Sequence, residues 1–530
     1  MDHVAPDRPS SSAPEDGAPL RGKPAALHEA DAGEQQAPFS AETERARHAQ
    51  QRWAQVPINE RLRRVRAFRH ELVDASRRIC KTIAGDVGKR YDETLVAEVL
   101  PLAQECRFLE ANARRILRPR KSPLRTRPIL LWGQRDVTFR RPRGVVAVIG
   151  TWNLPMAINV VPILHALTAG NAVLFKPSEV APRTGELIAD LIARAGFPDG
   201  LFQLLPASRD AGPQLAEADI DHVAFTGSST TGRVLASTLG RRLVTSTLEL
   251  SGCDLLLLLE DGNVPLAARG AWFGATANAG QACVGTRRAF VPRSLLEPFL
   301  DALVPLVECA APVPLILSAQ VKLADRLIAD ALGHGARLIR REGVEPADGH
   351  VQPAALVQPA PDTLACREAY FVPLLTVVPY DTVEQALAWD AECSYSLAAS
   401  VFTADVARAR TVATRLRCGV VHVNDVIIPM AHPATSFGGS GASGWGRTKG
   451  VEGLLEMTVP QVVSAVSGSF RPHFDTLGTH WFFDPDSFEA LIKLFHARSL
   501  RDKFGAARHL AGQVLGTRQR GPSDRFRDSQ

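Results

Sequence analysis

The chain has 530 residues and a formal net charge of +5. Its length exceeds what one hydrophobic core usually organises, so we expect two or three domains. The small net charge argues against nucleic acid as a partner. Its eight cysteines include no CxxC pair, which argues against a disulfide framework and a structural zinc site. We therefore expect no metal.

The N-terminal segment, residues 1–40, is rich in Pro, Ala, Ser, Asp and Glu and has no apolar periodicity. This composition predicts a disordered extension. The segment lacks the apolar core of a secretory signal and is too acidic for a mitochondrial transit peptide. Because no apolar run reaches the roughly 18 residues of a membrane span, we expect a cytoplasmic protein.

Apolar residues recur at helical spacing from about residue 41 to residue 117, which predicts helices that face a core on one side. Two β-prone stretches follow, at residues 129–132 and 137–139, before the apolar run 144–149. This order predicts a hairpin that leads into a core strand.

The next segment repeats a pattern of strand, turn and helix. Strands are predicted at 172–175 and 222–225; the first ends in Lys176, with Pro177 opening a helix, and the second runs into the glycine-rich turn 226–232. Such units predict an α/β fold with a doubly wound parallel sheet that binds ligands at the carboxyl ends of its strands. The G-x-G-x-x-G dinucleotide fingerprint is absent. A second α/β domain is predicted from 252 to 437, beginning with the strand 255–259.

Two residues have side chains that suit covalent chemistry. Cys283 follows a short Gly-containing stretch and could present a thiolate to an electrophile, although a free cysteine is often only a buried packing residue. Asn153 directly follows a core strand. Its amide could donate a hydrogen bond to a developing oxyanion, or it could bond the backbone of its own turn.

Three further polar residues fit an oxidoreductase site. Glu249 lies between a strand and a glycine among apolar neighbours, which would raise its pKa and suit it to act as a general base; the alternative is a solvated loop acid. Lys176 and Glu179 lie at a strand end, where Glu179 could accept hydrogen bonds from a ribose. Alternatively, Glu179 is an acid favoured by a helix dipole.

The order of these motifs resembles that of the aldehyde dehydrogenase superfamily over about residues 41 to 465. The motifs are Trp152-Asn-Leu-Pro155, Lys176-Pro-Ser-Glu179, Phe225-Thr-Gly-Ser228, Glu249-Leu-Ser-Gly252 and Gly280-Gln-Ala-Cys283. The resemblance implies that Cys283 is the nucleophile, Glu249 the general base, and Asn153 with the Cys283 backbone N–H the oxyanion hole. Cofactor contacts are implied for Trp152, Lys176, Glu179, Gly227 and Ser228.

The resemblance also implies the reaction. An aldehyde would be oxidised to a carboxylic acid through a thiohemiacetal and a thioester on Cys283, with NAD as the cofactor and NADP possible. Glu179 favours NAD because its carboxylate would repel a 2′-phosphate, and Glu249 favours hydrolysis over transfer to coenzyme A. An acyl-transferring semialdehyde dehydrogenase and a non-catalytic member kept for binding or assembly remain as alternatives.

The carboxyl half departs from the family pattern at one cofactor position. Aligning Phe371-Val-Pro373 with the family's Glu-x-Phe-Gly-Pro motif places Ala369 where a glutamate usually holds the nicotinamide ribose. Either Glu368 replaces it, or ribose binding is weaker. The segment 437–446 is similar to the fatty and aromatic aldehyde branch, so a lipophilic aldehyde is a candidate substrate.

The resemblance divides the chain into a cofactor-binding domain at 41–251 with an oligomerisation hairpin at 123–142, a catalytic domain at 252–437, a return segment and oligomerisation strand at 438–465, and an extension at 466–530. The edge strand suggests a homodimer or homotetramer. In the extension, four apolar residues at i, i+3, i+4 and i+7 precede several basic ones and predict an amphipathic helix: Phe488, Leu491, Ile492 and Phe495. We expect this helix to pack on protein rather than on a membrane.

Overall fold

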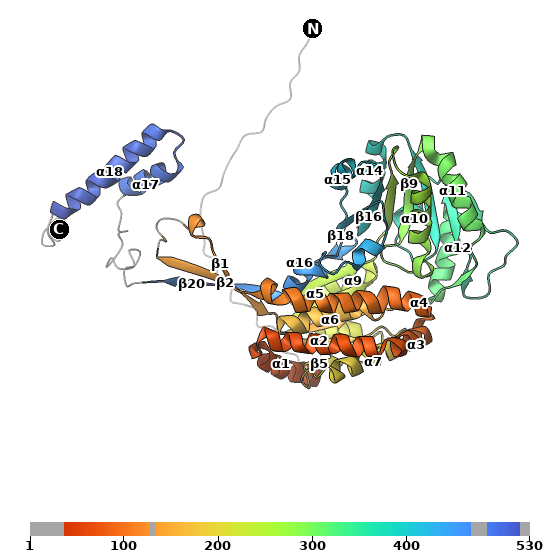
Figure 1. The fold of residues 1–530 in the computed structure, drawn as a ribbon, viewed down its shortest axis with the longest axis horizontal. Helices are drawn as coiled ribbons and strands as arrows, with labels where there is room; N and C mark the ends of the chain where they lie inside the picture. The colour runs from red at the N-terminus through yellow and green to blue at the C-terminus, as the bar shows by residue number, and fades with distance from the viewer. Residues whose placement is uncertain (1–36, 128–130, 132, 468–484, 520–530) are drawn as a thin grey trace, which may run out of the picture. The chain divides into compact units, whose positions relative to one another are not determined.

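The structure is a computed structural model that describes residues 37–127, 131, 133–467 and 485–519 (Figure 1). The predicted extension at 1–40 therefore lies almost entirely outside the described residues, and so does most of the predicted strand at 129–132. Contacts divide the chain into two units, one formed by residues 1–118 and 140–459 and the other by 119–139 and 460–530. All candidate site residues belong to the first unit.

The helical pattern predicted for the N-terminal part of the first unit is confirmed. The helices are α1 (Ser40–Gln55), α2 (Ile58–Asp74), α3 (Ser76–Val87), α4 (Tyr91–Thr94), the π-helix η1 (Leu95–Val99) and α5 (Leu100–Leu117). Their apolar faces are buried, with Trp53, Phe68 and Leu72 in one core. Gly88 directly follows the last residue of helix α3, and its φ of 67° is the left-handed conformation that glycine adopts without strain.

The first sheet has the strand order β19-β7-β6-β3-β4-β5, and only β19 runs antiparallel to its neighbour. The strands are β3 (Val145–Ile149), β4 (Ala172–Lys176), β5 (Phe202–Leu204), β6 (His222–Gly227), β7 (Thr245–Leu250) and β19 (Gly444–Trp445). The connecting helices are α6 (Ala157–Ala169), α7 (Pro182–Arg194), α8 (Ala211–Glu217) and α9 (Ser229–Arg241). The predicted doubly wound parallel sheet is thus confirmed. The chain leaves β3 toward β4 and returns on its other side at β6, which creates a ligand-binding switch point between β3 and β6.

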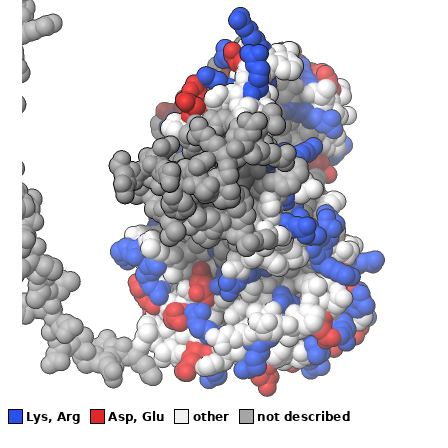
Figure 2. Space-filling model, turned by 90° about the vertical axis from the view of Figure 1, so that its left-hand side faces the viewer, with Lys and Arg blue, Asp and Glu red and all other residues white. Residues whose placement is uncertain are grey.

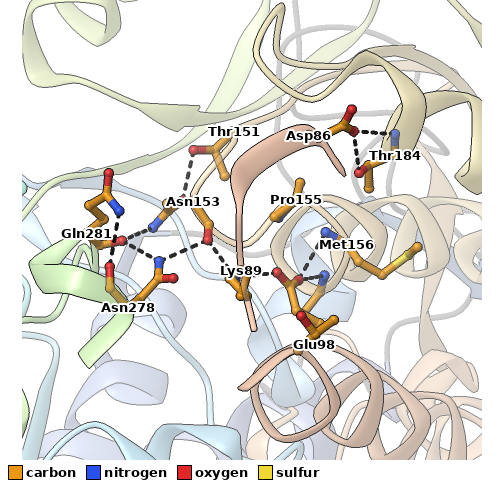
Figure 3. A network of polar contacts seen from close by, with 12 residues as sticks. Asp86, Lys89, Glu98, Thr151, Asn153, Pro155, Met156, Thr184, Asn278 and Gln281 are labelled. Carbon is orange, nitrogen blue, oxygen red and sulfur yellow. Dashed lines mark hydrogen bonds and ion pairs between the residues drawn. The ribbon is translucent and has the colours of Figure 1, made fainter. Parts of the chain in front are cut away.

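The predicted helix start at Pro177 is wrong, because α7 begins at Pro182. Residues 177–181 form a turn instead, so Glu179 precedes the helix. Asp86 caps this later start, since its Oδ2 accepts hydrogen bonds from the backbone N–H of Thr184 (2.8 Å) and from its hydroxyl (2.7 Å), as Figure 3 shows. The cap comes from a residue 98 positions away, which no local pattern indicates.

The second sheet has the order β11-β13-β14-β9-β8-β16-β17, with β11 antiparallel and the other pairs parallel. Its strands are β8 (Asp254–Leu258), β9 (Thr286–Pro292), β11 (Arg337–Arg340), β13 (Ala354–Val357), β14 (Leu374–Tyr380), β16 (Ala398–Phe402) and β17 (Val420–Val423). The flanking helices are α10 (Val264–Thr276), α11 (Leu296–Glu308), α12 (Ser318–Gly333), α13 (Leu364–Arg367), α14 (Val383–Glu392) and α15 (Val406–Ala413). Strand β8 confirms the apolar strand predicted at 255–259, and each face of this sheet has its own apolar core. The α/β fold class therefore holds for both sheets.

Smaller elements complete the first unit. Two short pairs of strands are β10 (Val313–Pro314) with β12 (His350–Val351) and β15 (Tyr395–Ser396) with β18 (Ser440–Gly441). Helix α16 (Gly450–Glu456) packs against α5 and α6. On the face drawn in Figure 2, basic and acidic side chains are interspersed with uncharged surface.

A three-stranded sheet consists of β1 (Arg120–Lys121), β2 (Gln134–Pro142) and β20 (Thr458–Val466). Strand β2 contains the predicted stretch 137–139, and its antiparallel partner β1 was not predicted. Strand β20 exposes the side chains of Val459, Val462 and Val463.

The extension forms two helices, α17 (Pro485–His496) and α18 (Leu500–Gln519), where the sequence predicts one amphipathic helix. The two helices pack on each other and bury Ala490 and Ala506. Ile492 and Phe495 stay exposed within this pair. In the part of the chain that the structure describes, no helix is long and apolar enough to cross a membrane.

Candidate active site

Cys283 lies in the loop between the 3-10 helix η4 (Ala277–Gly280) and β9, and it is only 8% exposed. The backbone before it reverses tightly, since Asn278, Ala279 and Gly280 have φ values of 53°, 56° and 75°. A Cβ on Gly280 would lie 2.4 Å from backbone atoms of Val372 and Pro373. Only glycine fits this approach without a shift, which explains why a glycine precedes the cysteine in the motif.

A buried arginine on strand β9 holds the Cys283 loop in place. Arg287 in β9 is fully buried and donates hydrogen bonds to the carbonyls of Gly280 (2.8 Å), Ala282 (2.9 Å) and Val372 (3.1 Å). Its guanidinium also lies 4.9 Å from the centre of the Tyr370 ring. Sequence reasoning missed Arg287, although its position four residues after the cysteine was visible.

Glu249 occupies β7 and is 4% exposed. Burial raises its pKa to about 7, against smaller opposite contributions from the Cys283 and Thr226 side chains. Among the described residues, its Oε1 has no hydrogen-bond partner. A buried carboxyl group that titrates near neutral pH is suited to take up and release a proton. The solvated loop acid considered from the sequence is therefore not what the structure contains.

The Glu249 segment and the Cys283 loop meet at Gly252. The backbone N–H of Gly252 donates to the Cys283 carbonyl (3.1 Å), and a Cβ there would lie 2.9 Å from that oxygen. The Cys283 thiol has a pKa well above its usual value because of burial and because of the carboxyl groups of Glu249 and Asp254. The thiol therefore carries its proton in this state and must lose it to react as a nucleophile.

Asn153 follows β3 and is 2% exposed. Its Nδ2 donates to the carbonyl of Gln281 (3.1 Å), and its Oδ1 accepts from the Thr151 hydroxyl (3.0 Å). The amide is thus tied to the loop that carries Cys283, 128 residues away, rather than to the backbone of its own turn. An amide nitrogen carries two hydrogens, so one N–H is left for a further acceptor.

The cofactor candidates lie at the carboxyl ends of β4 and β6. Lys176 Nζ is 3.4 Å from Glu179 Oε2, and Arg209 Nε is 3.1 Å from Glu179 Oε1. Burial raises the pKa of Glu179, but its backbone hydrogen bond, Lys176 and Arg209 outweigh burial and lower it. Glu179 is therefore an anion at neutral pH with a half-exposed carboxylate.

Ser228 follows Gly227, the last residue of β6, and caps α9, with its Oγ accepting from the backbone N–H of Thr231 (3.2 Å). The first N–H groups of a helix have no intrahelical partner and attract phosphate. Trp152 and Phe371 form an edge-to-face ring pair with centroids 5.6 Å apart. A carboxylate for a ribose, a helix N-terminus for a pyrophosphate and an aromatic pair fit a dinucleotide at the β3/β6 switch point.

The two residues considered for the nicotinamide ribose, Glu368 and Ala369, are not buried, unlike the candidate catalytic residues. Glu368 is exposed directly after α13, and Ala369 next to it is half-buried. Of this stretch, Phe371 is the residue that contacts the predicted cofactor residue Trp152.

A largely apolar cavity of about 220 Å³ opens beside Cys283 and Glu249. Its wall comes mainly from α5, α6 and the loop after β17, and includes Val96, Leu102, Leu154, Ile158, Val161, Ile427, Ile428, Met430 and Phe437. Besides Cys283 and Glu249, its polar lining residues are Glu105, Thr226, Thr448 and Lys449. This composition favours an apolar ligand next to the thiol.

Comparison with known proteins identifies the family. The family model described as "Aldehyde dehydrogenase family" matches residues 24–463. A protein from Methylomonas named 4,4'-diapolycopene aldehyde oxidase is 35% identical over 425 residues, which cover 78% of this chain and 79% of that protein.

Solved structures agree with this match. The crystal structure of Mycobacterium tuberculosis aldehyde dehydrogenase complexed with NAD+ is 28% identical, with a TM-score of 0.74 over 80% of this chain and 89% of that chain. An NADP-dependent enzyme from E. coli is 25% identical, with a TM-score of 0.75 over 81% and 90%. The chain belongs to the aldehyde dehydrogenase family.

Proposed function

We propose that this aldehyde dehydrogenase is hydrolytic: it converts an aldehyde and water to a carboxylic acid and passes a hydride to NAD(P). The observation that carries the proposal is one buried pocket in which the Cys283 thiol faces a carboxyl group with a pKa of about 7. A nucleophile beside a general base is what the formation and hydrolysis of a covalent acyl intermediate require.

In the first half-reaction, the Cys283 thiol gives up its proton to solvent, and its sulfur bonds to the aldehyde carbon. The carbonyl oxygen becomes an oxyanion, which the free N–H of the Asn153 amide and the backbone N–H of Cys283 stabilise. A bound nicotinamide would supply the acceptor for the hydride that leaves this carbon. Cys283 then carries a thioester.

In the second half-reaction, the Glu249 carboxylate takes a proton from water, whose oxygen attacks the thioester carbon. The C–S bond breaks, the carboxylic acid leaves and Cys283 recovers its thiolate. Because Glu249 titrates at about 7, it can both accept this proton and release it to solvent near neutral pH.

Lys176 and Glu179 would hold the adenosine ribose, Ser228 and Gly227 the pyrophosphate, and Trp152 with Phe371 would line the cofactor site. The named relatives bind NAD+ in one case and depend on NADP in another. We infer a preference for NAD in this chain, because the ionised Glu179 repels a 2′-phosphate while Arg209 beside it tempers that repulsion.

Replacing Glu179 with Gln tests this preference. We expect the KM for NAD to rise roughly tenfold, the value of about one hydrogen bond to a charged group, while the KM for NADP falls. Steady-state kinetics with each cofactor at saturating aldehyde measures both effects. Glu186→Gln, an exposed acid on α7, is the matched control and should change neither value. An unchanged NAD-to-NADP ratio in Glu179→Gln would contradict the assignment.

The substrate class follows from the cavity. Its apolar wall and the similarity to a 4,4'-diapolycopene aldehyde oxidase support a lipophilic aldehyde. In a panel of short aliphatic, long aliphatic and aromatic aldehydes, we expect kcat/KM to rise about threefold to fourfold per methylene until the cavity is full, since each buried CH₂ contributes about 0.8 kcal/mol. A flat or falling series would exclude this substrate class.

The same assay separates the two other hypotheses. An acyl-transferring semialdehyde dehydrogenase would need coenzyme A or phosphate for turnover, whereas the proposed enzyme needs only water. A non-catalytic member, suggested by Ala369 at the ribose position, would form no NADH with any aldehyde.

We also propose that the chain forms a homodimer or homotetramer through β20. The exposed valines of this strand support the proposal, because an apolar strand edge favours pairing with another copy.

A further inference from the structure

A buried ion pair outside the predicted site lies behind Asn153. Lys89 follows Gly88 at the end of α3, and Glu98 lies in η1. Their side chains are 1% and 0% exposed, and Lys89 Nζ is 2.6 Å from Glu98 Oε1. Neither residue belongs to a motif that the sequence analysis singled out.

Both members of the pair also hold the turn that carries Asn153. Lys89 Nζ donates to the Asn153 carbonyl (2.8 Å), and Glu98 Oε2 accepts from the backbone N–H groups of Met156 (3.1 Å) and Ala157 (2.8 Å). Figure 3 shows this chain of contacts, with Lys89 and Glu98 beside the turn. The pair thus holds the middle of the segment between β3 and α6 and its junction with α6.

The opposite side of Asn153 is held by the Cys283 loop. Asn278 Nδ2 donates to the same Asn153 carbonyl (3.1 Å) and to the Gln281 carbonyl (3.0 Å), which the Asn153 amide also contacts. The peptide of Asn153 is therefore fixed by a cation from one side and by the nucleophile loop from the other. This arrangement leaves the amide little freedom to turn.

The energetics favour a positioning role over a stabilising one. Burying two charges costs several kcal/mol per ion, so a buried ion pair is weak evidence of added stability over an apolar pair of similar size. The two charges orient the backbone of this turn. The Glu98 carboxylate accepts hydrogen bonds at the N-terminal end of α6, where the helix dipole is positive, and the Lys89 ammonium donates to the Asn153 carbonyl. An apolar pair could not orient either group.

We propose that Lys89 and Glu98 are positioning residues that aim the Asn153 amide at the oxyanion formed on Cys283. The inference rests on the proposed function, in which Asn153 stabilises that oxyanion. The pair does not touch the substrate and acts only through Asn153.

Lys89→Met removes the charge and keeps most of the side-chain length. We expect kcat to fall about 10- to 100-fold, because a shift of about 1 Å in a catalytic group can cost that much. NAD affinity, measured by fluorescence titration, should stay within about twofold, as the hydrogen bonds of the pair go to Asn153, Met156 and Ala157 and not to the proposed cofactor residues. Glu98→Gln, which preserves shape, should lower kcat in the same direction and serves if Lys89→Met does not fold.

A double-mutant cycle with Asn153→Ala distinguishes positioning from a general loss of packing. Asn153→Ala alone should cost about 10²- to 10³-fold in kcat, as for an oxyanion donor. If the pair acts through Asn153, adding Lys89→Met, or Glu98→Gln, to Asn153→Ala costs nothing further. Effects that multiply would overturn the inference.

Arg69→Met is the matched control, since it breaks an ion pair with Glu110 on α5 away from the turn. Its kcat should stay near that of the wild type at equal folded fraction by circular dichroism. If Asn153→Ala loses activity but Lys89→Met and Glu98→Gln do not, the positioning role is refuted and the proposed function still stands. Full activity in Asn153→Ala refutes the proposed function itself.

Discussion

Cys283→Ser should abolish aldehyde-dependent NADH formation, with a loss of at least about 10⁴-fold, as seen when a covalent nucleophile is removed. A serine hydroxyl fits the same buried volume but does not ionise near neutral pH, so it does not supply the nucleophile. Single-turnover absorbance of NADH at saturating aldehyde measures the effect. NAD affinity should be unchanged, which separates loss of chemistry from loss of fold.

The other cysteines provide a control for this substitution. Cys309 is exposed at the end of α11, so Cys309→Ser should retain wild-type turnover. Retention of more than a tenth of wild-type activity in Cys283→Ser would contradict the assignment of the nucleophile.

Glu249→Gln should block release of the acyl group while leaving the first half-reaction intact. We expect steady-state turnover to fall about 10²- to 10⁴-fold, the range for loss of a general base. Rapid mixing with aldehyde and NAD should still give a burst of about one NADH per active site, because the thioester forms and is not hydrolysed. A variant that loses the burst together with turnover would show that Glu249 acts earlier.

The pH profile gives an independent check on the same residue. Only the carboxylate form accepts a proton from water, and the pKa of Glu249 is raised to about 7. The rate of thioester hydrolysis, measured as kcat when that step limits turnover, should therefore rise with pH up to about 7 and level off above it, because the acylated Cys283 no longer titrates. In Glu249→Gln the residual turnover should not change in this window. If the turnover of Glu249→Gln still rises with pH up to about 7, that rise belongs to another titrating group.

The sequence motifs predicted which strand ends and turns carry the polar residues of the candidate site. Cys283, Glu249 and Asn153 each follow or occupy a recognisable strand or turn. Cys283 and Glu249 line one cavity, and the Asn153 amide reaches the Cys283 loop through the Gln281 carbonyl. The strands β3, β4, β6 and β8 were predictable for a similar reason, since buried parallel strands are continuous apolar runs.

What could not be predicted depends on contacts between distant residues. Lys89 contacts Asn153, which is 64 residues away in the sequence. Asp86 caps the start of α7 at Thr184, which is 98 residues away. Neither leaves a periodic or compositional trace. The strands between residues 310 and 361 are only two to four residues long, too short for an alternating pattern to indicate them.

The most direct test of the account is the intact mass of Glu249→Gln after one turnover with aldehyde and NAD. A thioester adds the mass of the aldehyde less two hydrogen atoms, and we predict this adduct on the peptide that contains Cys283, removable by hydroxylamine. NADH formed without any adduct, or with the adduct on another residue, would contradict covalent catalysis by Cys283.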